Sequence, residues 1–245
     1  MTFTVKLANK FIQIESVHEA MREFCKDYLV EDCIPDFYIH LTQKDIDLEK
    51  QQTTEQTFSE AYLETLALLR KISDMLPNHR RFLIHGASIS YEDNAYLFTA
   101  PSGTGKSTHI RLWKKHLGDK VKIVNGDKPF VSLEQNEEGT LFPLIYGTPW
   151  AGKERWQRNC AEPLKGICFV QRGTTNTIRK MQPEECISML FHQVYLPNDA
   201  GAVGQTLELI DLLVKNVPLY LLTCDISEEA VRCSFEAMTG LTYPN

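Results

Sequence analysis

The residues best suited to chemistry lie in one short segment, Ala100 to Thr108, which reads APSGTGKST. Gly103 and Gly105 can adopt positive φ and turn consecutive backbone N–H groups toward a single anion. The helix expected to begin at Lys106 adds the positive end of its dipole at the same place. A loop of this kind between an apolar strand and an amphipathic helix predicts a binding site for phosphate groups.

The side chains of this segment have separate expected roles. Lys106 would bridge the β- and γ-phosphates of a nucleotide, and Ser107 would offer its hydroxyl to Mg²⁺. The pattern G-x-x-x-x-G-K-[ST] begins with glycine, and Ala100 stands there instead, a change that matters only if its φ must be positive. The alternative is a glycine-rich turn followed by a capped helix. The expected nucleotide-binding residues are Ser102, Gly103, Thr104, Gly105, Lys106, Ser107 and Thr108.

A carboxylate follows the next strand-like run. The apolar residues Val121 to Val124 predict a strand, and Asn125, Gly126 and Asp127 come directly after it. Because Mg²⁺ in nucleotide sites is held by a carboxylate together with the substrate's phosphates, Asp127 is the expected metal ligand alongside Ser107. The alternative is that Asp127 is only a turn residue in a Gly-Asp-Lys-Pro sequence. Its place at the end of a strand favours metal binding.

The first 80 residues are expected to form a small α/β unit. Alternating apolar residues predict strand structure at 3–14 and 37–41, and helical spacing predicts a helix over 17–29. Residues 58–76 form a second helical stripe that ends before Pro77. The polar run 43–56 has no sustained apolar period and is expected to be an exposed, mobile connection.

Residues 81–245 are expected to form the α/β domain that carries the loop. One strand is predicted over 81–90 and a second over 95–100, so that the two make a hairpin. A helix over Lys106–Leu117 and the strand Val121–Val124, which is apolar enough to lie within the sheet, follow. The remaining expected elements are strands at 166–171 and 219–224 and helices at 183–194, 203–217 and 227–238.

Composition narrows the class of protein. The 245 residues include 43% hydrophobic side chains and carry a formal charge of -6, which argues against a nucleic-acid binder that needs clustered Lys and Arg. No run approaches the roughly 18 to 20 apolar residues of a membrane span, and the start of the chain lacks a signal-peptide core. We therefore expect a cytoplasmic protein that binds neither nucleic acid nor membrane.

Taken together, the motifs resemble the HPr kinase/phosphorylase and phosphoenolpyruvate carboxykinase superfamily. Ile84 to Ala87 is similar to the histidine-glycine strand before the phosphate loop of HPr kinases, and Asn125 to Lys128 falls at their acidic site. The segment Tyr146 to Lys153 resembles the Gly-Thr-Pro-Trp loop of smaller HPr-kinase-related proteins, some of which phosphorylate free serine or a peptide hydroxyl. The resemblance covers about residues 80 to 240.

The resemblance implies the P-loop-containing mixed sheet of that superfamily and an ATP-dependent kinase. The γ-phosphate would pass to a hydroxyl, that of a serine, while Mg²⁺ neutralises the developing charge. HPr kinases carry two adjacent aspartates, one on the metal and one proposed as general base, and the first of the pair is Gly126 here. Asp127 would then serve the metal, and His85 becomes the candidate for orienting or deprotonating the nucleophile. The alternative is a hydrogen-bonded core histidine.

A local excess of cations follows at residues 147–158. Lys153, after Gly152 in a flexible turn, is expected to contact phosphate or substrate, the alternative being a solvated surface cation. Trp150 either lines the pocket or packs, and Arg172 and Asn176 are weaker candidates for the same cleft. The expected catalytic residues are thus His85, Lys106, Asp127 and Lys153.

Three other activities share these motifs. A carboxykinase would need a second metal site and arginines for carboxylates, and known members are much longer than this chain. A degenerate kinase or nucleotide-binding switch would hold ATP without turnover, and Gly126 supports it. A phosphorylase would run the reverse reaction on the same loop.

The acceptor and the oligomeric state stay open. Free serine, a small alcohol, HPr and a precursor peptide all fit, and residues 1–80 are the expected acceptor-recognition unit. HPr kinases use a larger, different N-terminal domain, so a small molecule or peptide is favoured over HPr. A homo-oligomer is neither required nor excluded, because Leu207, Ile210, Leu213 and Val214 suit a core as well as an interface.

Overall fold

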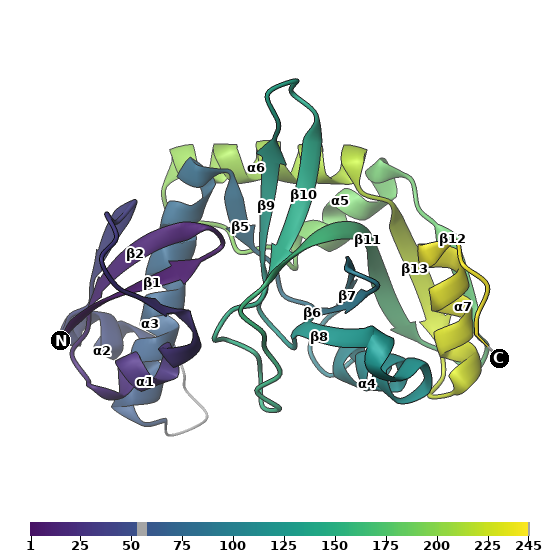
Figure 1. Ribbon diagram of the computed structural model, residues 1–245, viewed down its shortest axis with the longest axis horizontal. Helices are drawn as coiled ribbons and strands as arrows, with labels where there is room; N and C mark the ends of the chain where they lie inside the picture. Colours follow the sequence, from purple (N-terminus) through teal and green to yellow (C-terminus); the bar gives the residue numbers. More distant parts are fainter. Residues whose placement is uncertain (53–57, 245) are drawn as a thin grey trace.

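The computed structural model describes residues 1–52 and 58–244 of the chain. Within these residues the backbone forms two β-sheets with helices packed on them (Figure 1). The N-terminal sheet has the strand order β3-β1-β2-β4. β1 (Thr2–Leu7) and β2 (Lys10–Glu15) form the antiparallel hairpin, β3 (Leu29–Val30) pairs antiparallel with β1, and β4 (Phe37–His40) runs parallel to β2.

The helices of the N-terminal unit are α1 (Ala20–Phe24), α2 (Gln43–Gln52) and α3 (Glu60–Met75). The helix predicted over 17–29 is therefore shorter than expected, and a 3₁₀ turn at Lys26–Tyr28 follows it. The buried carboxylate of Glu64 explains the late start, because it accepts the backbone N–H groups of Val17 and His18 at 2.6 and 3.0 Å. Those two residues are thereby held outside the helix.

The prediction of an exposed connection over 43–56 is wrong for residues 43–52, which form α2, and its remaining residues lie outside the described part of the chain. Ile46 is the one apolar side chain that α2 buries in the described structure. One buried apolar residue gives no apolar period in the sequence. Ion pairs to α3 supply the rest: Arg70 meets Glu49 at 2.7 Å, and Lys71 meets Asp45 at 2.8 Å. A polar helix of this kind is stabilised by its partner helix rather than by its own pattern.

The larger sheet follows the path β5-β9-β10-β11-β7-β6-β8, with β13 added beside β11 and β12 beside β13. Its strands are β5 (Arg81–Leu83), β6 (Ala87–Tyr91), β7 (Asn94–Thr99), β8 (Val121–Asn125), β9 (Phe130–Gln135), β10 (Leu141–Tyr146), β11 (Ala161–Arg172), β12 (Thr177–Lys180) and β13 (Leu219–Cys224). The β6–β7 hairpin is confirmed. β8 pairs with β6 at the edge of the described sheet, and β9, β10 and β12 were not predicted.

The long strand β11 makes the sheet curl. Its first residues pair antiparallel with β10, its middle pairs parallel with β7, and from Ile167 onward it also pairs parallel with β13. One strand thus joins an antiparallel half to a parallel half. The expected mixed α/β architecture, a sheet flanked by helices, is confirmed.

Helices cover both faces of this sheet. α4 (Lys106–Leu117) and α7 (Glu228–Thr239) share one buried cluster with β6, β7, β8, β11 and β13. α5 (Pro183–Phe191) and α6 (Ala200–Asn216) share another with β5, β9, β10 and the opposite side of β7 and β11. In Figure 1, α6 passes behind β9 and β10, whereas α4 lies beside β8 and α7 beside β13. No helix within the described residues is long and apolar enough to cross a membrane.

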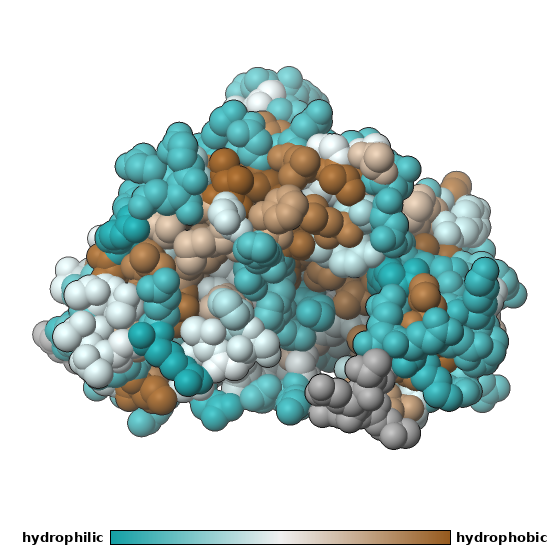
Figure 2. Space-filling view, turned by 180° about the vertical axis from the view of Figure 1, so that it is seen from behind, coloured by the Kyte–Doolittle hydropathy of each residue, from teal (hydrophilic) through white to brown (hydrophobic). Residues whose placement is uncertain are grey.

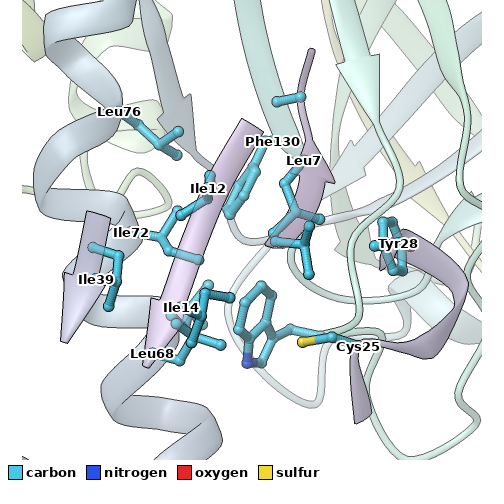
Figure 3. Packing of buried hydrophobic residues seen from close by; sticks show 14 of the residues in the cluster. Leu7, Ile12, Ile14, Cys25, Tyr28, Ile39, Leu68, Ile72, Leu76 and Phe130 are labelled. Atoms are coloured by element: carbon cyan, nitrogen blue, oxygen red, sulfur yellow. The ribbon is translucent and has the colours of Figure 1, made fainter. Parts of the chain in front are cut away.

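A third buried cluster joins the N-terminal unit to the large sheet. Leu7, Ile12 and Leu68 pack in the same cluster as Phe130, the first residue of β9 (Figure 3). Trp150, in the segment after β10, belongs to this cluster too. Arg81 adds a polar link, because its buried guanidinium donates to the carbonyl of Ala8 at the β1–β2 turn. A chain division at residue 80 stays a prediction, and apolar packing crosses it.

The helical face that left the oligomeric state open is largely core. Ile210, Leu213 and Val214 of α6 are buried, whereas Leu207 is 44% exposed. Figure 2 shows apolar surface gathered on the face that α5 and α6 cover, where Ile187 and Phe191 are also exposed.

Candidate functional site

The loop between β7 and α4 has the backbone that the sequence predicted. Gly103 and Gly105 have positive φ, 77° and 122°, and Gly105 is the residue that caps α4. Ala100 is not among the described residues with positive φ, so alanine at this position causes no strain. Lys106 is buried, and its Nζ donates to the carbonyls of Ala100 at 2.8 Å and Pro101 at 3.3 Å.

A second cation holds the other side of the loop. Arg172, at the end of β11, donates from Nε to the carbonyl of Thr104 at 3.0 Å and from Nη2 to the carbonyl of Gly103. In a planar trans peptide the C=O of one residue and the N–H of the next point in opposite directions. Because Arg172 draws these two carbonyls to one side, the N–H of Gly105 faces the other side, whereas the N–H of Thr104 donates to the carbonyl of Pro101 at 3.3 Å. The sequence ranked Arg172 low, yet it touches the loop directly.

The acidic residue sits in a turn built on Asn125. The Asn125 side chain is fully buried, and its Oδ1 accepts the backbone N–H groups of Asp127 at 2.9 Å and Lys128 at 2.8 Å. Its Nδ2 donates to the carbonyl and hydroxyl oxygens of Thr148 at 3.0 and 3.1 Å. All four bonds are internal to the protein, so the turn has one fixed shape. The sequence motif includes Asn125, but nothing in it indicated that the Asn125 side chain would hold the turn.

His85 and Asp127 meet at the centre of the site. The predicted strand 81–90 breaks into β5 and β6, which leaves His85 between two strands. Its Nε2 lies 3.4 Å from Oδ1 of Asp127, and its Nδ1 lies 3.1 Å from Oε1 of Gln193. The backbone N–H of Gly86 donates to the carbonyl of Asp127 at 2.9 Å, and the Thr99 hydroxyl donates to the carbonyl of His85 at 2.8 Å. His85 is thus half-buried, with partners at both ring nitrogens, and its catalytic role stays a prediction.

The break in the strand has a steric cause. A Cβ on Gly86 would lie 2.6 Å from Cδ1 of Leu97 and 3.0 Å from the carbonyl oxygen of Phe98. A side chain at residue 86 would therefore require Leu97 to move and β7 to shift slightly, so glycine suits this close approach to β7. Gln193, which follows α5, was not predicted as a site residue. It lies 108 positions after His85 in the sequence, and no motif around it indicates that the two side chains meet.

The segment between β10 and β11 covers the acidic turn. The N–H of Gly126 donates to the carbonyl of Trp156 at 2.9 Å, and that of Lys128 to the carbonyl of Trp150 at 3.1 Å. A Cβ on Gly126 would lie 2.7 Å from the carbonyl oxygen of Ala151. A second aspartate beside Asp127 is therefore excluded by packing, which explains why this chain has glycine there.

Two predicted residues of this segment have different surroundings. Trp150 packs rather than lining a pocket: its ring lies between Phe24 and Phe130, and its Nε1 donates to the carbonyl of Thr65 in α3 at 2.8 Å. Lys153 is exposed, and the described residues give its ammonium no ion pair or hydrogen bond. Its neighbour Gly152 adjoins Asp127, because a Cβ there would lie 3.3 Å from the Asp127 Cβ. Lys153 is thus close to the acidic turn but not fixed on it.

The charges around Asp127 act on one another. Burial by itself raises the pKa of Asp127, but the hydrogen bond from His85 and the positive charges of Lys128, His85 and Lys106 outweigh it and lower that pKa below its usual value. Burial lowers the pKa of Lys106, which the charge of Asp127 opposes and that of Lys128 reinforces. Lys106 and Asp127 therefore belong to one electrostatic site.

Pockets flank the loop on both sides of Arg172. The first, about 690 Å³, is lined by residues 99–104, by the end of β11, and by Met189, His192 and Gln193. The second, about 560 Å³, is lined by Thr104, Gly105 and Thr108, by His109 and Leu112 of α4, and by residues 224–226 after β13. Asn176 braces the second pocket: its side chain donates to the Ser227 hydroxyl at 3.2 Å and accepts the Asp225 N–H at 3.0 Å.

The predicted nucleotide-binding residues divide between these pockets. Ser102 and Gly103 line the first, Gly105 and Thr108 the second, and Thr104 lines both. Ser107, in the first turn of α4, is half-buried. That these residues bind a nucleotide stays a prediction.

Comparison with known proteins gives a distant likeness among solved structures. No protein-family model and no curated protein matches this chain. Among solved structures the chain is similar to the HPr(Ser) kinase/phosphatase from Coxiella burnetii, with a TM-score of 0.34 and 13% sequence identity over 64% of this chain and 93% of that chain. This is a distant relation of fold, and it assigns no residue of the site.

Proposed function

We propose that this protein is an ATP-dependent kinase that transfers the γ-phosphate of ATP to a hydroxyl group, that of a serine, with Mg²⁺. One observation carries the proposal: the glycine-rich loop and a carboxylate are joined through His85. Thr99, just before the loop, donates its hydroxyl to the His85 carbonyl at 2.8 Å, and Nε2 of His85 lies 3.4 Å from Oδ1 of Asp127. Lys106 is bonded to the loop's own carbonyls. Phosphoryl transfer needs this combination of anion cradle, cation and acidic group.

The loop would hold the phosphates of ATP. The positive φ of Gly105 and the contact of Arg172 with the Thr104 carbonyl would turn the Gly105 N–H, at the N-terminus of α4, toward a bound anion. The nucleoside would occupy the second pocket, because Thr108 lies there, one helical step beyond Ser107. Leu112 and the 76% exposed Ile226 offer apolar contacts for a base in that pocket.

The donor set fits Mg²⁺ that arrives with the nucleotide. Mg²⁺ usually keeps several waters and is held by one or two carboxylates plus substrate phosphates. Asp127, kept charged by its lowered pKa, and the hydroxyl of Ser107 would complete that set. In the part of the chain that the structure describes, no three His, Cys, Asp or Glu side chains form a metal site by themselves. When bound, the ion neutralises charge on the transferring phosphoryl group.

The side chains would then position the acceptor. A bond forms between the acceptor oxygen and the γ-phosphorus as the bond from that phosphorus to the β-phosphate oxygen breaks. The hydroxyl proton passes to solvent, and ADP leaves. Because the transition state of such transfers is loose, orientation of the acceptor matters more than a strong base.

His85 and Lys153 would assist in different ways. Both ring nitrogens of His85 face partners, Asp127 and Gln193, so we assign it to positioning the carboxylate rather than to removing the proton. Lys153 stands on the exposed turn beside Asp127, where its charge would stabilise the transferring phosphoryl group once substrate is bound.

Calorimetric titration with ATP, with and without Mg²⁺, tests the nucleotide site. Lys106→Ala should lower the affinity for Mg-ATP at least about 100-fold, because charge-assisted hydrogen bonds to phosphate are among the strongest. Asp127→Asn should remove the dependence on Mg²⁺ while leaving metal-free binding. Lys115→Ala, an exposed lysine of the same helix, is the matched control and should bind as wild type. Equal affinity in all four proteins would refute the proposal.

A nucleotide-binding switch without turnover is the second candidate. Gly126 favours it, because packing against Ala151 leaves a single carboxylate where HPr kinases carry two. Both candidates predict the same titration. Transfer of labelled γ-phosphate to an acceptor separates them, since a switch yields no phosphorylated product.

A further inference from the structure

The first pocket opens beside the reacting groups rather than beside the nucleoside. One of its ends is Gln193, whose side chain faces His85, and Thr99 bonds the His85 carbonyl from the same wall. Its other side is the outer surface of the loop, residues 100–104. If ATP occupies the loop and the second pocket, a molecule in the first pocket lies beside Gln193, which contacts His85, and His85 in turn faces Asp127. The first pocket is therefore the one beside which an acceptor would be held.

The wall of this pocket combines an apolar surface with positive charge. Phe169 and Val170 of β11 and Met189 of α5 provide the apolar part. Arg172 and His192 are its basic side chains, and Arg172 donates to neutral carbonyls, so its charge is not compensated by an ion pair among the described residues. Near Arg172 such a wall disfavours an ammonium group and favours a carboxylate, and over Phe169, Val170 and Met189 it favours apolar atoms.

The size of the pocket points the same way. At about 690 Å³ it lies within the range of sites that enclose a drug-sized ligand. Free serine is far smaller and would leave most of the wall uncovered. A serine within a peptide has no ammonium group, and the side chain next to it can cover Met189 and Phe169.

We propose that the first pocket selects a peptide acceptor in which an apolar side chain adjoins the phosphorylated serine, and that free serine is a poor acceptor. This inference rests on the proposed kinase function and names its substrate class. The amides of Gln193 and Gln171 line the same pocket and can bond the peptide backbone, which fits a peptide better than a hydrocarbon ligand.

A capped peptide library is the test. The peptides carry one serine, acetylated and amidated ends, and one fixed neighbour per pool, and each pool is incubated with labelled Mg-ATP beside free serine. Pools with Leu, Met or Phe next to the serine should be labelled on the order of tenfold faster than pools with Lys and than free serine.

A charge reversal in the wall separates pocket chemistry from loss of fold. Met189→Glu should invert the preference, slowing apolar pools on the order of tenfold and speeding Lys pools above their wild-type rate. A gain of activity cannot come from misfolding. Ile187→Glu adds the same charge to an exposed position of α5 that does not line the pocket, and it should keep the wild-type preference.

Each outcome decides. Faster labelling of free serine than of any pool overturns the inference and leaves the kinase standing. An unchanged preference in Met189→Glu also overturns it. Lys106-dependent binding of Mg-ATP with no labelled acceptor overturns it and favours the switch. Absence of nucleotide binding removes the proposed function, and the inference with it.

Discussion

The loop and the acidic turn of the site are held in different ways. Lys106 bonds carbonyls five and six residues before it, so most of the loop is shaped by its own neighbours, with Arg172 added from β11. The acidic turn is held by Asn125, by Thr148 and by the segment up to Trp156, with Gln193 behind His85. The first is a local structure near the surface, and the second is assembled from distant parts of the chain.

Because the loop and the acidic turn are held differently, substitutions in them should affect nucleotide affinity and folding stability to different extents. Damage to the loop should weaken nucleotide binding with little effect on folding, because few buried groups lose partners. Damage to the acidic turn should cost stability as well as transfer, because buried backbone groups there have no solvent to replace their partners.

The largest effect is expected at Gly147, where the covering segment begins. A Cβ there would lie 1.8 Å from the carbonyl oxygen of Arg158 and 2.7 Å from that of Val124. Because both are backbone atoms, Gly147→Ala must displace the segment from the acidic turn. We expect a loss of at least about 4 kcal/mol in the free energy of unfolding, measured by urea denaturation.

Gly204→Ala is the matched control. A Cβ at Gly204 in α6 meets nothing within 4 Å, and alanine is the better helix former. The free energy of unfolding should rise by up to about 1 kcal/mol. A similar small change in Gly147→Ala would show that the covering segment is not packed against the turn.

Asn125→Ala removes the centre of the acidic turn. Two buried N–H groups, of Asp127 and Lys128, lose their acceptor, at roughly 1 to 3 kcal/mol each. We expect about 4 kcal/mol of lost stability, the middle of the summed range, and a larger fall in phosphate transfer than in metal-free ATP binding. Asn94→Ala, at the half-buried first position of β7, removes one solvent-exposed hydrogen bond to the carbonyl of Glu92 and should change stability by less than about 0.5 kcal/mol. Parallel loss of transfer and of ATP affinity would contradict the separation of the two halves.

His109 tests the buried support beneath the loop. Its Nε2 lies 3.0 Å from the Ser234 hydroxyl and accepts from Trp113, and burial lowers its pKa from 6.5 to about 4. In the unfolded chain the ring takes up a proton as pH falls through 6.5, whereas the folded protein keeps it neutral until about pH 4. The stability due to the neutral ring is complete above pH 6.5 and lost progressively down to about pH 4.

The total loss from this group is on the order of 3 kcal/mol. The difference in unfolding free energy between wild type and His109→Gln, measured by urea denaturation from pH 7 to pH 4.5, isolates it from the carboxylates. Gln retains an acceptor for Trp113. Identical pH profiles in the two proteins would mean that the folded ring titrates normally.

Arg172→Ala is expected to have the smallest effect on folding. The loop loses the donor that holds the carbonyls of Gly103 and Thr104. Affinity for Mg-ATP should fall about tenfold, or about 1.4 kcal/mol, with the free energy of unfolding changed by less than about 0.5 kcal/mol. Added guanidinium should restore part of the affinity of Arg172→Ala for Mg-ATP. Arg172→Lys should bind Mg-ATP more weakly than wild type, because one ammonium group cannot match the planar guanidinium fork. Lost stability with unchanged affinity would reverse the assignment.

The same contrast explains what the sequence could predict. The loop, α4 and the β6–β7 hairpin follow from glycine positions, a lysine at a fixed offset and alternating apolar residues, all within a few positions. Asp127 was found because it ends a strand. Gln193 and the role of Asn125 could not be found, since they depend on which distant segments the sheet brings together. The prediction of one strand over 81–90 is wrong at Gly86, where the chain breaks between β5 and β6. Gly86 fits there because its backbone lies close to β7, a contact that no local sequence pattern indicates.

Labelled γ-phosphate transfer from Mg-ATP tests the central claim most directly, with wild type, Lys106→Ala, Asp127→Asn and Lys115→Ala assayed against serine and capped serine peptides. We expect a phosphorylated acceptor from wild type and Lys115→Ala, and a fall of at least about 1000-fold in Lys106→Ala and Asp127→Asn. Transfer that survives both of these substitutions, or no transfer from wild type to any acceptor, would contradict a kinase built on this loop and this carboxylate.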